Sequence, residues 1–424
     1  MADKIQSVKG MHDILNDDTS NWQYLEKTIQ GVLNRYGYKE IRTPVVEKTE
    51  LFERSIGETT DIVSKEMYTF SDTGGDRLTL RPEGTAGSVR SLMQHGQYQN
   101  SPLRLWYCGP MFRRERPQKG RLRQFHQIGA EVYGLPGPDI DAELIAICAR
   151  FWKELGLSEL ELQINTLGSG DARKRYRQIL VDYFSDHKAS LDDDSRVRLG
   201  KNPMRILDSK NPDMQSIINA APGMGDYMDD ESMEHFDGLK QLLTAINISY
   251  TVNPRLVRGL DYYSNTVFEW VSDKLGAQGT VCAGGRYDGL IEHFGGKQIP
   301  GIGFAMGLER LVELLPEDDQ RVKRQAPHVY LIISGEGVSR DGFRLAEQIK
   351  DALPGLRLVM HCGGGSFKSQ FKKADKSGAD LALILGEEET QKQTIGLKPL
   401  RRESNQSEIS WDLIASALQS ELKL

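Results

Sequence analysis

The sequence predicts an α+β protein with two domains. The large domain is built on a mixed, mainly antiparallel sheet flanked by helices, and the small C-terminal domain is of the α/β type. Strand candidates before residue 316 include two adjacent pairs, which is typical of antiparallel sheets. Residues 170–235 interrupt this order with charged helical stretches and loops, which indicates a helical insertion. After the polar, proline-bounded segment 316–326, strands and helices alternate to the end, which indicates a separate α/β unit.

Composition agrees with a globular protein that has ample core. The chain has 424 residues, 38% of them hydrophobic, and a formal net charge of −6. Such a chain can bind nucleic acid only through a focused basic patch. No apolar run is long enough to span a membrane and the N-terminus has no signal-peptide pattern, so we expect no membrane partner and a cytoplasmic location. The four cysteines lack CxxC spacing, which argues against a disulfide framework and a zinc site and favours a reducing compartment.

The first elements are a helix and a strand that contains proline. Apolar residues recur at helical spacing from Thr19 to Tyr36, with Thr19 or Ser20 as a possible cap and Gly37 as a possible end. The next stretch, 38–48, is a predicted strand that holds Pro44. Because proline lacks a backbone donor, this strand is expected at an edge or with a bulge. Two interpretations stay open, a dimer seam and an ordinary covered edge.

Two further strands, 66–72 and 76–85, form a predicted antiparallel pair around a Gly74-Gly75 turn. The second strand runs directly into a helix over 85–96. Glu83 stands at this junction, where a side chain can point into a cleft. The alternative is that Glu83 only favours the helix N-terminus electrostatically.

A hairpin of unusual charge follows. The strands 103–109 and 124–134 enclose a loop with six basic residues, and Glu115 is its only acid (the bases are Arg113, Arg114, Arg116, Lys119, Arg121 and Arg123). Arginine binds phosphate with a planar fork that contacts two oxygens. The alternative is a solvated hairpin tip. Since the chain elsewhere is acidic, we interpret the loop as a phosphate site.

The rest of the large domain contains a helix over 139–155, a strand over 159–168 and the insertion. The sheet is expected to resume over 248–271 and 279–296, and the glycine-rich strand and helix over 299–315 end the domain. Residues 326–424 hold 13 lysines and arginines and 13 acids, so the first 325 residues carry the whole net charge.

Several common site motifs are excluded or weak. GIGFAMG has Met306 where a dinucleotide-binding fingerprint requires its third glycine. No P-loop pattern, HExxH or Cys/His cluster occurs. By contrast, glycine, arginine and acid clusters recur at predicted strand ends. A cleft with Arg113, Arg121, Arg258 and Arg310 would suit a polyphosphate. The neighbouring acids, amides and hydroxyls would suit a second, cationic or amide-like ligand (Glu83, Gln127, Glu131, Tyr262 and Tyr263).

These stretches resemble a known family. The Pro44 segment, the FRRE hairpin and GLER at the head of a late helix resemble motifs 1, 2 and 3 of class II aminoacyl-tRNA synthetases. LVRGLDYY and AGGRYDGL resemble the two signature motifs of the histidyl-tRNA synthetase family. The resemblance implies a class II catalytic domain over 1–325, with the 170–235 insertion, and an anticodon-binding domain over 326–424. It also implies a homodimer.

The implied reaction joins L-histidine to tRNA(His) through a histidyl-adenylate made from ATP, with release of pyrophosphate and AMP. By resemblance, Arg113 contacts the α-phosphate and Arg310 the γ-phosphate, with Arg121 as a second γ-phosphate contact. Phe125 would stack on adenine and Glu115 would accept from its amine. Arg258 would lie opposite Arg113, where other class II enzymes hold magnesium. Mg²⁺ is therefore expected mainly on the ATP phosphates, without confident protein ligands, and no zinc is expected.

The resemblance also assigns the amino acid and the tRNA. Glu83, with Gly84, Thr85 and Gln127, would hold the ammonium group. Glu131 and Tyr263 would bind the imidazole, Tyr262 and Tyr287 would line its pocket, and Arg258 would also face histidine. The tRNA acceptor end would meet Arg116, Gln118 and Lys119. The basic helix with Lys368, Lys372, Lys373 and Lys376 would meet the anticodon region, or is simply solvated surface.

Two other hypotheses remain. A synthetase-like binding or regulatory protein could keep the fold and lose tRNA charging. It would be expected to lose the basic hairpin, a catalytic arginine or the C-terminal domain, and all three are present. The other hypothesis is a class II enzyme for a different amino acid, which only the two signature stretches and Glu131 argue against.

Overall fold

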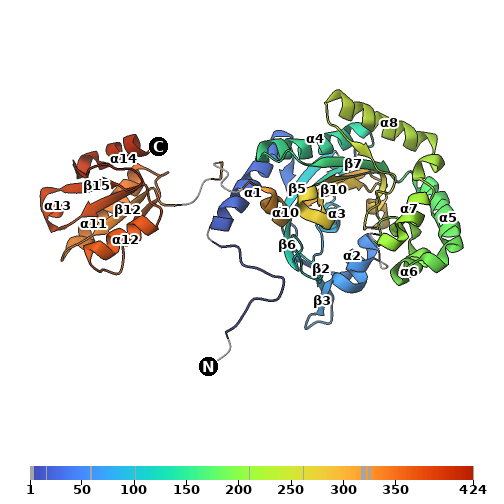
Figure 1. Ribbon diagram of the computed structural model, residues 1–424, viewed down its shortest axis with the longest axis horizontal. Coiled ribbons are helices and arrows are strands. Elements are labelled where there is room, and N and C mark those ends of the chain that lie inside the picture. The colour runs from blue at the N-terminus through green and yellow to red at the C-terminus, as the bar shows by residue number, and fades with distance from the viewer. Residues whose placement is uncertain are drawn as a thin grey trace. The chain divides into compact units, whose positions relative to one another are not determined.

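The computed structural model describes residues 4–15, 17–57, 60–100, 102–209, 211–260, 262–316, 321–322 and 326–423. The chain divides into two compact units, Met1–Val322 and Lys323–Leu424, shown in Figure 1. Most of the expected linker 316–326 lies outside the described residues, as does Asp261 of the LVRGLDYY stretch. Within the described ranges, no helix is both long and apolar enough to cross a membrane.

An eight-stranded sheet forms the centre of the first unit, in the order β1-β5-β6-β11-β10-β9-β7-β8. The outer pairs β1/β5 and β7/β8 are parallel and the inner neighbours are antiparallel, as predicted for a mixed, mainly antiparallel sheet. The strands are β1 (Lys39–Glu40), β5 (Leu103–Phe112), β6 (Gln124–Tyr133), β7 (Glu161–Thr166), β8 (Thr251–Val252), β9 (Ser264–Val271), β10 (Thr280–Arg286) and β11 (Gly301–Gly307).

Four helices share one hydrophobic core with one face of this sheet. They are α1 (Asp17–Arg35), α4 (Pro138–Leu155), α8 (Asp230–Ala245) and α10 (Leu308–Leu314). The predicted apolar stripe of α1 is confirmed, since Leu25, Ile29 and Val32 are fully buried. Thr19 and Ser20 lie inside the helix, so the prediction that one of them caps it is wrong.

The opposite face of the sheet carries the smaller helices and the insertion. These are α2 (Thr49–Ile56), α3 (Thr85–Gln94), α5 (Gly170–Asp186), α6 (Asp193–Lys201), α7 (Gln215–Ala220) and α9 (Leu290–His293). The first unit also contains a short π-helix (Ile62–Glu66). Its 3-10 turns are Gln97–Asn100, Lys188–Ser190, Pro203–Ile206, Pro212–Met214, Met224–Tyr227 and Asp273–Gln278, the last of which lies between β9 and β10. The predicted helical character of 170–235 is thus present, although α8 begins inside that range and packs on α4.

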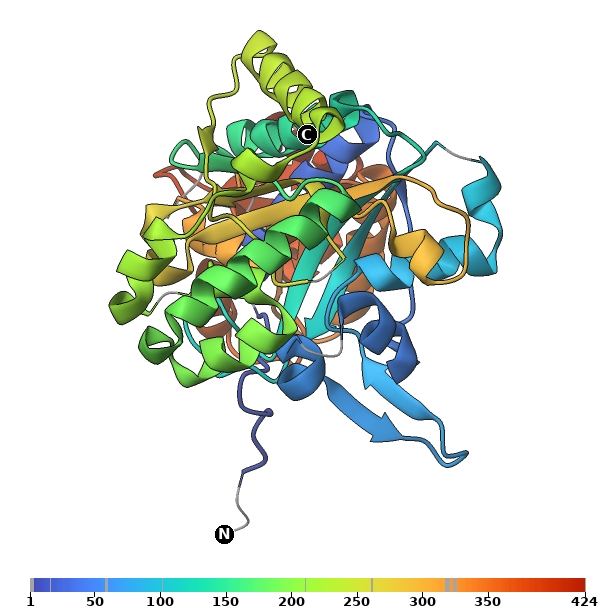
Figure 2. The same cartoon turned by 90° about the vertical axis from the view of Figure 1, so that its right-hand side faces the viewer.

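The strand predicted around Pro44 is two strands in two sheets. β1 ends at Glu40, and β2 (Val46–Lys48) starts a three-stranded sheet in the order β2-β4-β3 with β3 (Tyr68–Ser71) and β4 (Arg77–Leu80). Both β1 and β2 are edge strands, as expected of a segment with proline. The buried guanidinium of Arg81 donates to the Thr43 carbonyl over 3.1 Å and fixes the chain between the two strands. Figure 2 shows the β3–β4 pair projecting from the unit.

The stretch 248–271 is also broken. β8 and β9 are separated by a loop that carries Arg258, so the expectation of continuous sheet there is wrong. Pro254 and Gly259 fall in this loop, and neither favours a strand interior.

The second unit is a five-stranded sheet in the order β13-β12-β14-β15-β16, with its own core. The first three strands are parallel and the last two antiparallel, which confirms the predicted α/β character. Its elements are β12 (Val329–Ile333), α11 (Val338–Ala352), β13 (Leu358–Met360), α12 (Phe367–Lys376), β14 (Leu381–Leu385), α13 (Glu387–Lys392), β15 (Thr394–Pro399), β16 (Ser407–Ser410), a 3-10 turn (Trp411–Leu413) and α14 (Ile414–Leu422).

Candidate active site

A cavity of about 630 Å³ opens on the face of the large sheet opposite α1 and α4. Twelve residues singled out from the sequence line it: Glu83, Thr85, Arg113, Glu115, Arg121, Phe125, Gln127, Arg258, Tyr262, Tyr263, Tyr287 and Arg310. The fold therefore brings together residues that are more than 200 positions apart in the chain.

Strand periodicity explains why the cavity exists. Along β11 the large side chains Ile302, Phe304 and Met306 belong to the core with α1 and α4, and the residues between them are glycine or alanine. Because successive strand residues point to opposite faces, the small residues lie on the cavity side and leave space there. Gly303, Ala305 and Gly307 thus form the floor of the cavity within an antiparallel sheet.

Glu131 lies on β6 behind the cavity wall and is 1% exposed. The hydroxyl of Thr85 donates to its Oε1 over 2.7 Å and that of Tyr107 over 3.1 Å, and the Tyr287 hydroxyl donates to Oε2. Burial raises the pKa of Glu131 to about 8, although these donors oppose the rise. The carboxyl group is reached from the cavity through the hydroxyls of Thr85 and Tyr287, both of which line it.

Sequence reasoning missed Tyr107, which is 3% exposed and has its ring packed between two glycines. A Cβ at Gly84 would lie 2.2 Å from the Tyr107 ring, and one at Gly129 would lie 2.4 Å from it. Gly84 does not itself line the cavity; it leaves room for this tyrosine. The signal available in the sequence was Tyr107 itself, an aromatic residue on the first strand of the hairpin.

Glu83 is held at the N-terminus of α3. Its carboxylate accepts the backbone N–H groups of Thr85 over 2.6 Å and Ala86 over 2.9 Å. Burial raises the pKa of Glu83, and these two N–H groups oppose the rise. The two interpretations of Glu83 from the sequence are therefore both realised, since the same carboxylate caps a helix and lines the cavity.

The basic hairpin places two arginines around one acid. Glu115 Oε2 accepts from Arg121 over 2.9 Å, and its Oε1 lies 3.9 Å from Arg113. Arg113 Nε donates to the Pro82 carbonyl over 2.9 Å, and its guanidinium lies 5.2 Å from the centre of the Phe125 ring. These contacts tie the hairpin to the segment that carries Glu83.

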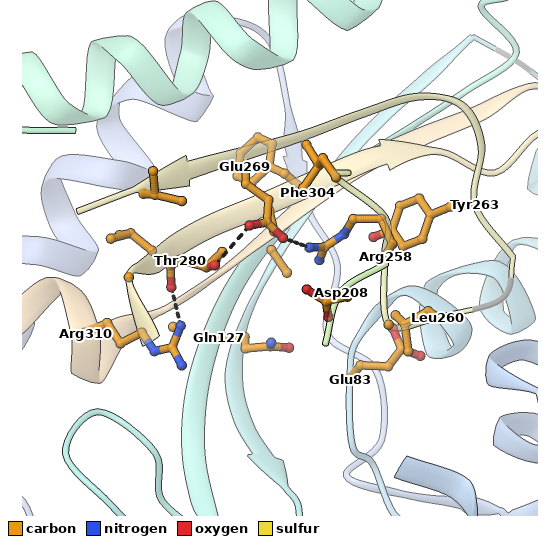
Figure 3. A pocket seen from close by; sticks show the side chains of 18 of the residues that line it. Glu83, Gln127, Asp208, Arg258, Leu260, Tyr263, Glu269, Thr280, Phe304 and Arg310 are labelled. Atoms are coloured by element: carbon orange, nitrogen blue, oxygen red, sulfur yellow. Dashed lines mark hydrogen bonds and ion pairs between the residues drawn. The ribbon is translucent and has the colours of Figure 1, made fainter. Parts of the chain in front are cut away.

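Arg258 and Arg310 complete the set of arginines, as Figure 3 shows. Arg258 forms an ion pair with Glu269, and Arg310 donates to the carbonyls of Thr280 and of Gly120. Among the described residues that line the cavity, two buried polar atoms have no hydrogen-bond partner, Arg258 Nε and Gln127 Oε1. One is a donor and the other an acceptor, so they are suited to the two charged ends of a bound ligand.

Four further residues of this region were not identified from the sequence. Glu269, Thr280 and Asp208 line the cavity, and Asp208 comes from the insertion. Glu309 of GLER also lines it, and its carboxylate accepts the His126 N–H over 2.9 Å, which joins α10 to β6. Glu309 could have been found, because it stands inside a recognised motif. Glu269 and Asp208 carry no such signal.

The described residues contain no group of three or more His, Cys, Asp or Glu side chains that could hold a metal ion. The acids nearest the arginines, Glu115 and Glu269, already form ion pairs.

The residues expected to meet tRNA are exposed. On the hairpin, Arg116, Gln118 and Lys119 are exposed, and Arg113 and Arg121, which line the cavity, are half-buried. In the second unit, all four lysines of α12 are exposed, namely Lys368, Lys372, Lys373 and Lys376.

The fold and the cavity define a class II aminoacyl-tRNA synthetase. A sequence profile described as Histidyl-tRNA synthetase matches residues 10–172 and 195–311, and one described as Anticodon binding domain matches residues 328–421. The chain therefore belongs to the histidyl-tRNA synthetase family.

Individual relatives agree with this assignment. A histidine–tRNA ligase of Hydrogenovibrio crunogenus is 55% identical over 422 residues, which cover 100% of this chain and 99% of the relative. The crystal structure of apo S. aureus histidyl-tRNA synthetase has a TM-score of 0.82 and 34% identity, over 98% of this chain and all of that one. A structure from Bacillus halodurans, titled as an ATP phosphoribosyltransferase regulatory subunit/histidyl-tRNA synthetase, shares only the fold, with 22% identity, a TM-score of 0.65 and coverage of 91% of this chain and 99% of that one.

Proposed function

We propose that this protein joins L-histidine to tRNA(His) with ATP, through a histidyl-adenylate, and releases pyrophosphate and AMP. The observation that carries the proposal is the buried Glu131 and its three hydroxyl donors at one side of a cavity that is also lined by the four predicted arginines. One side suits a small polar ring and the other suits a polyphosphate. The identity and coverage of the Hydrogenovibrio relative support the same function.

The first step brings the histidine carboxylate to the α-phosphorus of ATP. Both are anionic, so fixed cations must lower the cost of their approach and stabilise the charge of the transition state. We assign this role to Arg113 and Arg258 as catalytic residues. Arg310 and Arg121 would hold the γ-phosphate, and Phe125 and Glu115 the adenine ring and its amine.

The amino acid would bind with its ammonium group between Glu83 and Gln127. The free acceptor Oε1 of Gln127 is suited to an ammonium donor. The imidazole would lie against Tyr262, Tyr263 and Tyr287, and Glu131 would orient the Tyr287 hydroxyl by accepting its hydrogen bond. A pocket whose buried polar groups need a ring N–H rejects side chains without one by roughly 10⁴–10⁵, because those groups are left unpaired.

Magnesium fits the site only as an ion carried by the phosphates. The acids beside the four arginines are ion-paired, and Arg258 supplies positive charge where a protein-bound ion would otherwise act. When bound, Mg²⁺ would neutralise phosphate charge and keep several water ligands.

Binding of tRNA is assigned to two basic surfaces. The exposed hairpin residues Arg116, Gln118 and Lys119 would meet the acceptor end, and Lys368 and Lys372 on α12 would meet the anticodon region. A homodimer remains a prediction from the family resemblance and from the Pro44 segment. A cytoplasmic location remains a prediction from the sequence pattern.

The test is ATP–pyrophosphate exchange with each of the twenty amino acids, without tRNA. We expect exchange with histidine alone. Exchange with another amino acid would refute the histidine pocket, and no exchange at all would favour a binding protein that keeps the fold. In Arg258→Ala, exchange should fall by about 10²–10³, as when one donor to developing charge is lost, and ATP affinity should change far less.

A further inference from the structure

Arg258 and Arg310 are connected by a chain of hydrogen bonds through Glu269 and Thr280. Arg258 Nη1 donates to Glu269 Oε1, and the Thr280 hydroxyl donates to Glu269 Oε2 over 3.0 Å. The carbonyl of Thr280 accepts from Arg310 Nη1. Figure 3 shows the chain crossing the cleft. Glu269 thus receives a hydrogen bond on each oxygen, and Thr280 contributes both its side chain and its backbone.

A β-bulge makes this arrangement possible. Ala283 pairs with Glu269 and Cys282 with Trp270, but Thr280, not Val281, pairs with Val271, because the register shifts between Thr280 and Cys282. Val271 and Glu269 are two residues apart and share the cleft face of β9. The shift therefore moves Thr280 to that face, where its hydroxyl reaches Glu269. Without the bulge, Val281 would occupy the position and no hydroxyl would be present there.

The two arginines differ in how their charges are balanced. Burial disfavours the charged form of Arg258, but Glu269 and the neighbouring Tyr263 outweigh it, so the pKa of Arg258 is raised. Burial, followed by the charge of Arg121, lowers the pKa of Arg310. Within the described residues, Arg310 has carbonyl acceptors but no carboxylate partner. Its guanidinium is thus oriented without a directly paired carboxylate, as a site for an incoming anion requires.

We propose that Glu269 and Thr280 are positioning residues that fix Arg258 and Arg310 at a set separation before ATP binds. Glu269 holds one edge of the Arg258 guanidinium and leaves Nε, which has no partner in the described chain, for the substrate. Thr280 orients Glu269 with its hydroxyl and Arg310 with its carbonyl. The proposal rests on the proposed function, because it assigns the two arginines to the phosphates. Donors fixed in advance lower a barrier more than donors that must reorganise during the reaction.

The test uses Thr280→Val, which removes the hydroxyl and keeps the shape. Its matched control is Thr266→Val on β9, where the buried hydroxyl has no partner among the described residues. Glu269→Gln keeps an acceptor for Thr280 and removes the charge, and Thr280→Ser restores the hydroxyl. The measurements are kcat and KM for ATP in histidine-dependent ATP–pyrophosphate exchange, together with thermal melting of each variant.

We expect Thr280→Val to lower kcat about tenfold and to change KM for ATP less than twofold, because the other arginines still bind the phosphates. Glu269→Gln should lower kcat further, Thr280→Ser should recover most of it, and Thr266→Val should match the wild type. A kcat within twofold of wild type in Thr280→Val would overturn the proposal and leave the function intact. An equal decrease of kcat in Thr280→Val and Thr280→Ser would also overturn the proposal. A wild-type protein that exchanges with no amino acid would refute the function itself, and this role with it.

Discussion

Gly303 and Glu131 face each other across the paired strands β11 and β6, and only a glycine fits opposite this carboxylate. The two residues are partners in the strand register. A Cβ at Gly303 would lie 1.7 Å from Glu131 Oε2 and 2.7 Å from the Ala130 carbonyl oxygen. The backbone of Gly303 has no unusual conformation, so the requirement comes from space alone.

Gly303→Ala should therefore displace Glu131 and separate it from at least one of its hydroxyl donors. We expect the KM for histidine in pyrophosphate exchange to rise by about 10²-fold or more, because a buried carboxyl loses its partners. Melting should show whether the fold survives. Gly31→Ala on α1, where a Cβ would meet nothing within 4 Å, is the control and should leave the KM for histidine at the wild-type value. An unchanged KM for histidine in Gly303→Ala would remove Glu131 from the pocket.

The raised pKa of Glu131 also predicts how the stability of the protein depends on pH. Its pKa rises from 4.5 to about 8 on folding, chiefly through burial. Between these values the folded state binds more protons than the unfolded state, so this group makes the free energy of unfolding fall as pH rises. Glu131→Gln cannot titrate. From pH 6 to pH 8.5 the melting temperature of the wild type should therefore drop relative to that of Glu131→Gln. If the melting temperatures of the two proteins change with pH by the same amount across this range, Glu131 is ionised in the folded protein.

A buried ion pair outside the cavity supports the segment that carries Tyr287. Asp141 on α4 is fully buried and lies 2.6 Å from Arg286, which is 1% exposed and also donates to the Gly137 carbonyl. Asp288 Oδ1 also lies 3.3 Å from Arg286, so Asp141→Asn removes one of two carboxylate partners. This change should lower the free energy of unfolding by about 3 kcal/mol. The control is Asp171→Asn, whose pair with Lys174 is more than 80% exposed and should be worth under about 1 kcal/mol. Chemical denaturation measures both, and equal effects would contradict the role of burial.

The lysines of α12 predict a salt-dependent contact with tRNA. Lys372→Glu/Lys373→Glu should raise the KM for tRNA and reduce the slope of log affinity against log salt by about one for each lysine that meets a phosphate. Histidine activation without tRNA should not change. Lys350→Glu/Lys392→Glu changes the net charge by the same amount on two other helices of the unit and serves as the control. Equal tRNA kinetics in the two double variants would exclude α12 from the interface.

Local sequence patterns were sufficient to predict features that depend on a single helix, hairpin or strand. The apolar stripe of α1, the hairpin of β5 and β6 and the α/β alternation after residue 326 are visible as periodicity and turn chemistry. Arg113 and Arg310 were identified because they fall in short motifs, and Arg121 because it lies in the basic hairpin loop. The predictions of secondary structure were wrong where contacts with residues distant in the sequence determine the path of the chain. The Pro44 segment was expected as one strand, but Arg81 fixes the chain between two sheets, and the Arg258 loop was expected to be part of the sheet.

The sequence by itself determined the class of fold, the family and twelve of the residues that line the cavity, because these are recorded in periodicity and in contiguous motifs. Only the tertiary structure decided which other residues hold the cavity residues in position. Tyr107 is defined by two glycines 45 residues apart, and Thr280 reaches Glu269 only through a shift in strand register. Such contacts depend on how far apart two strands lie in the folded sheet. The order of residues along the chain does not give that distance.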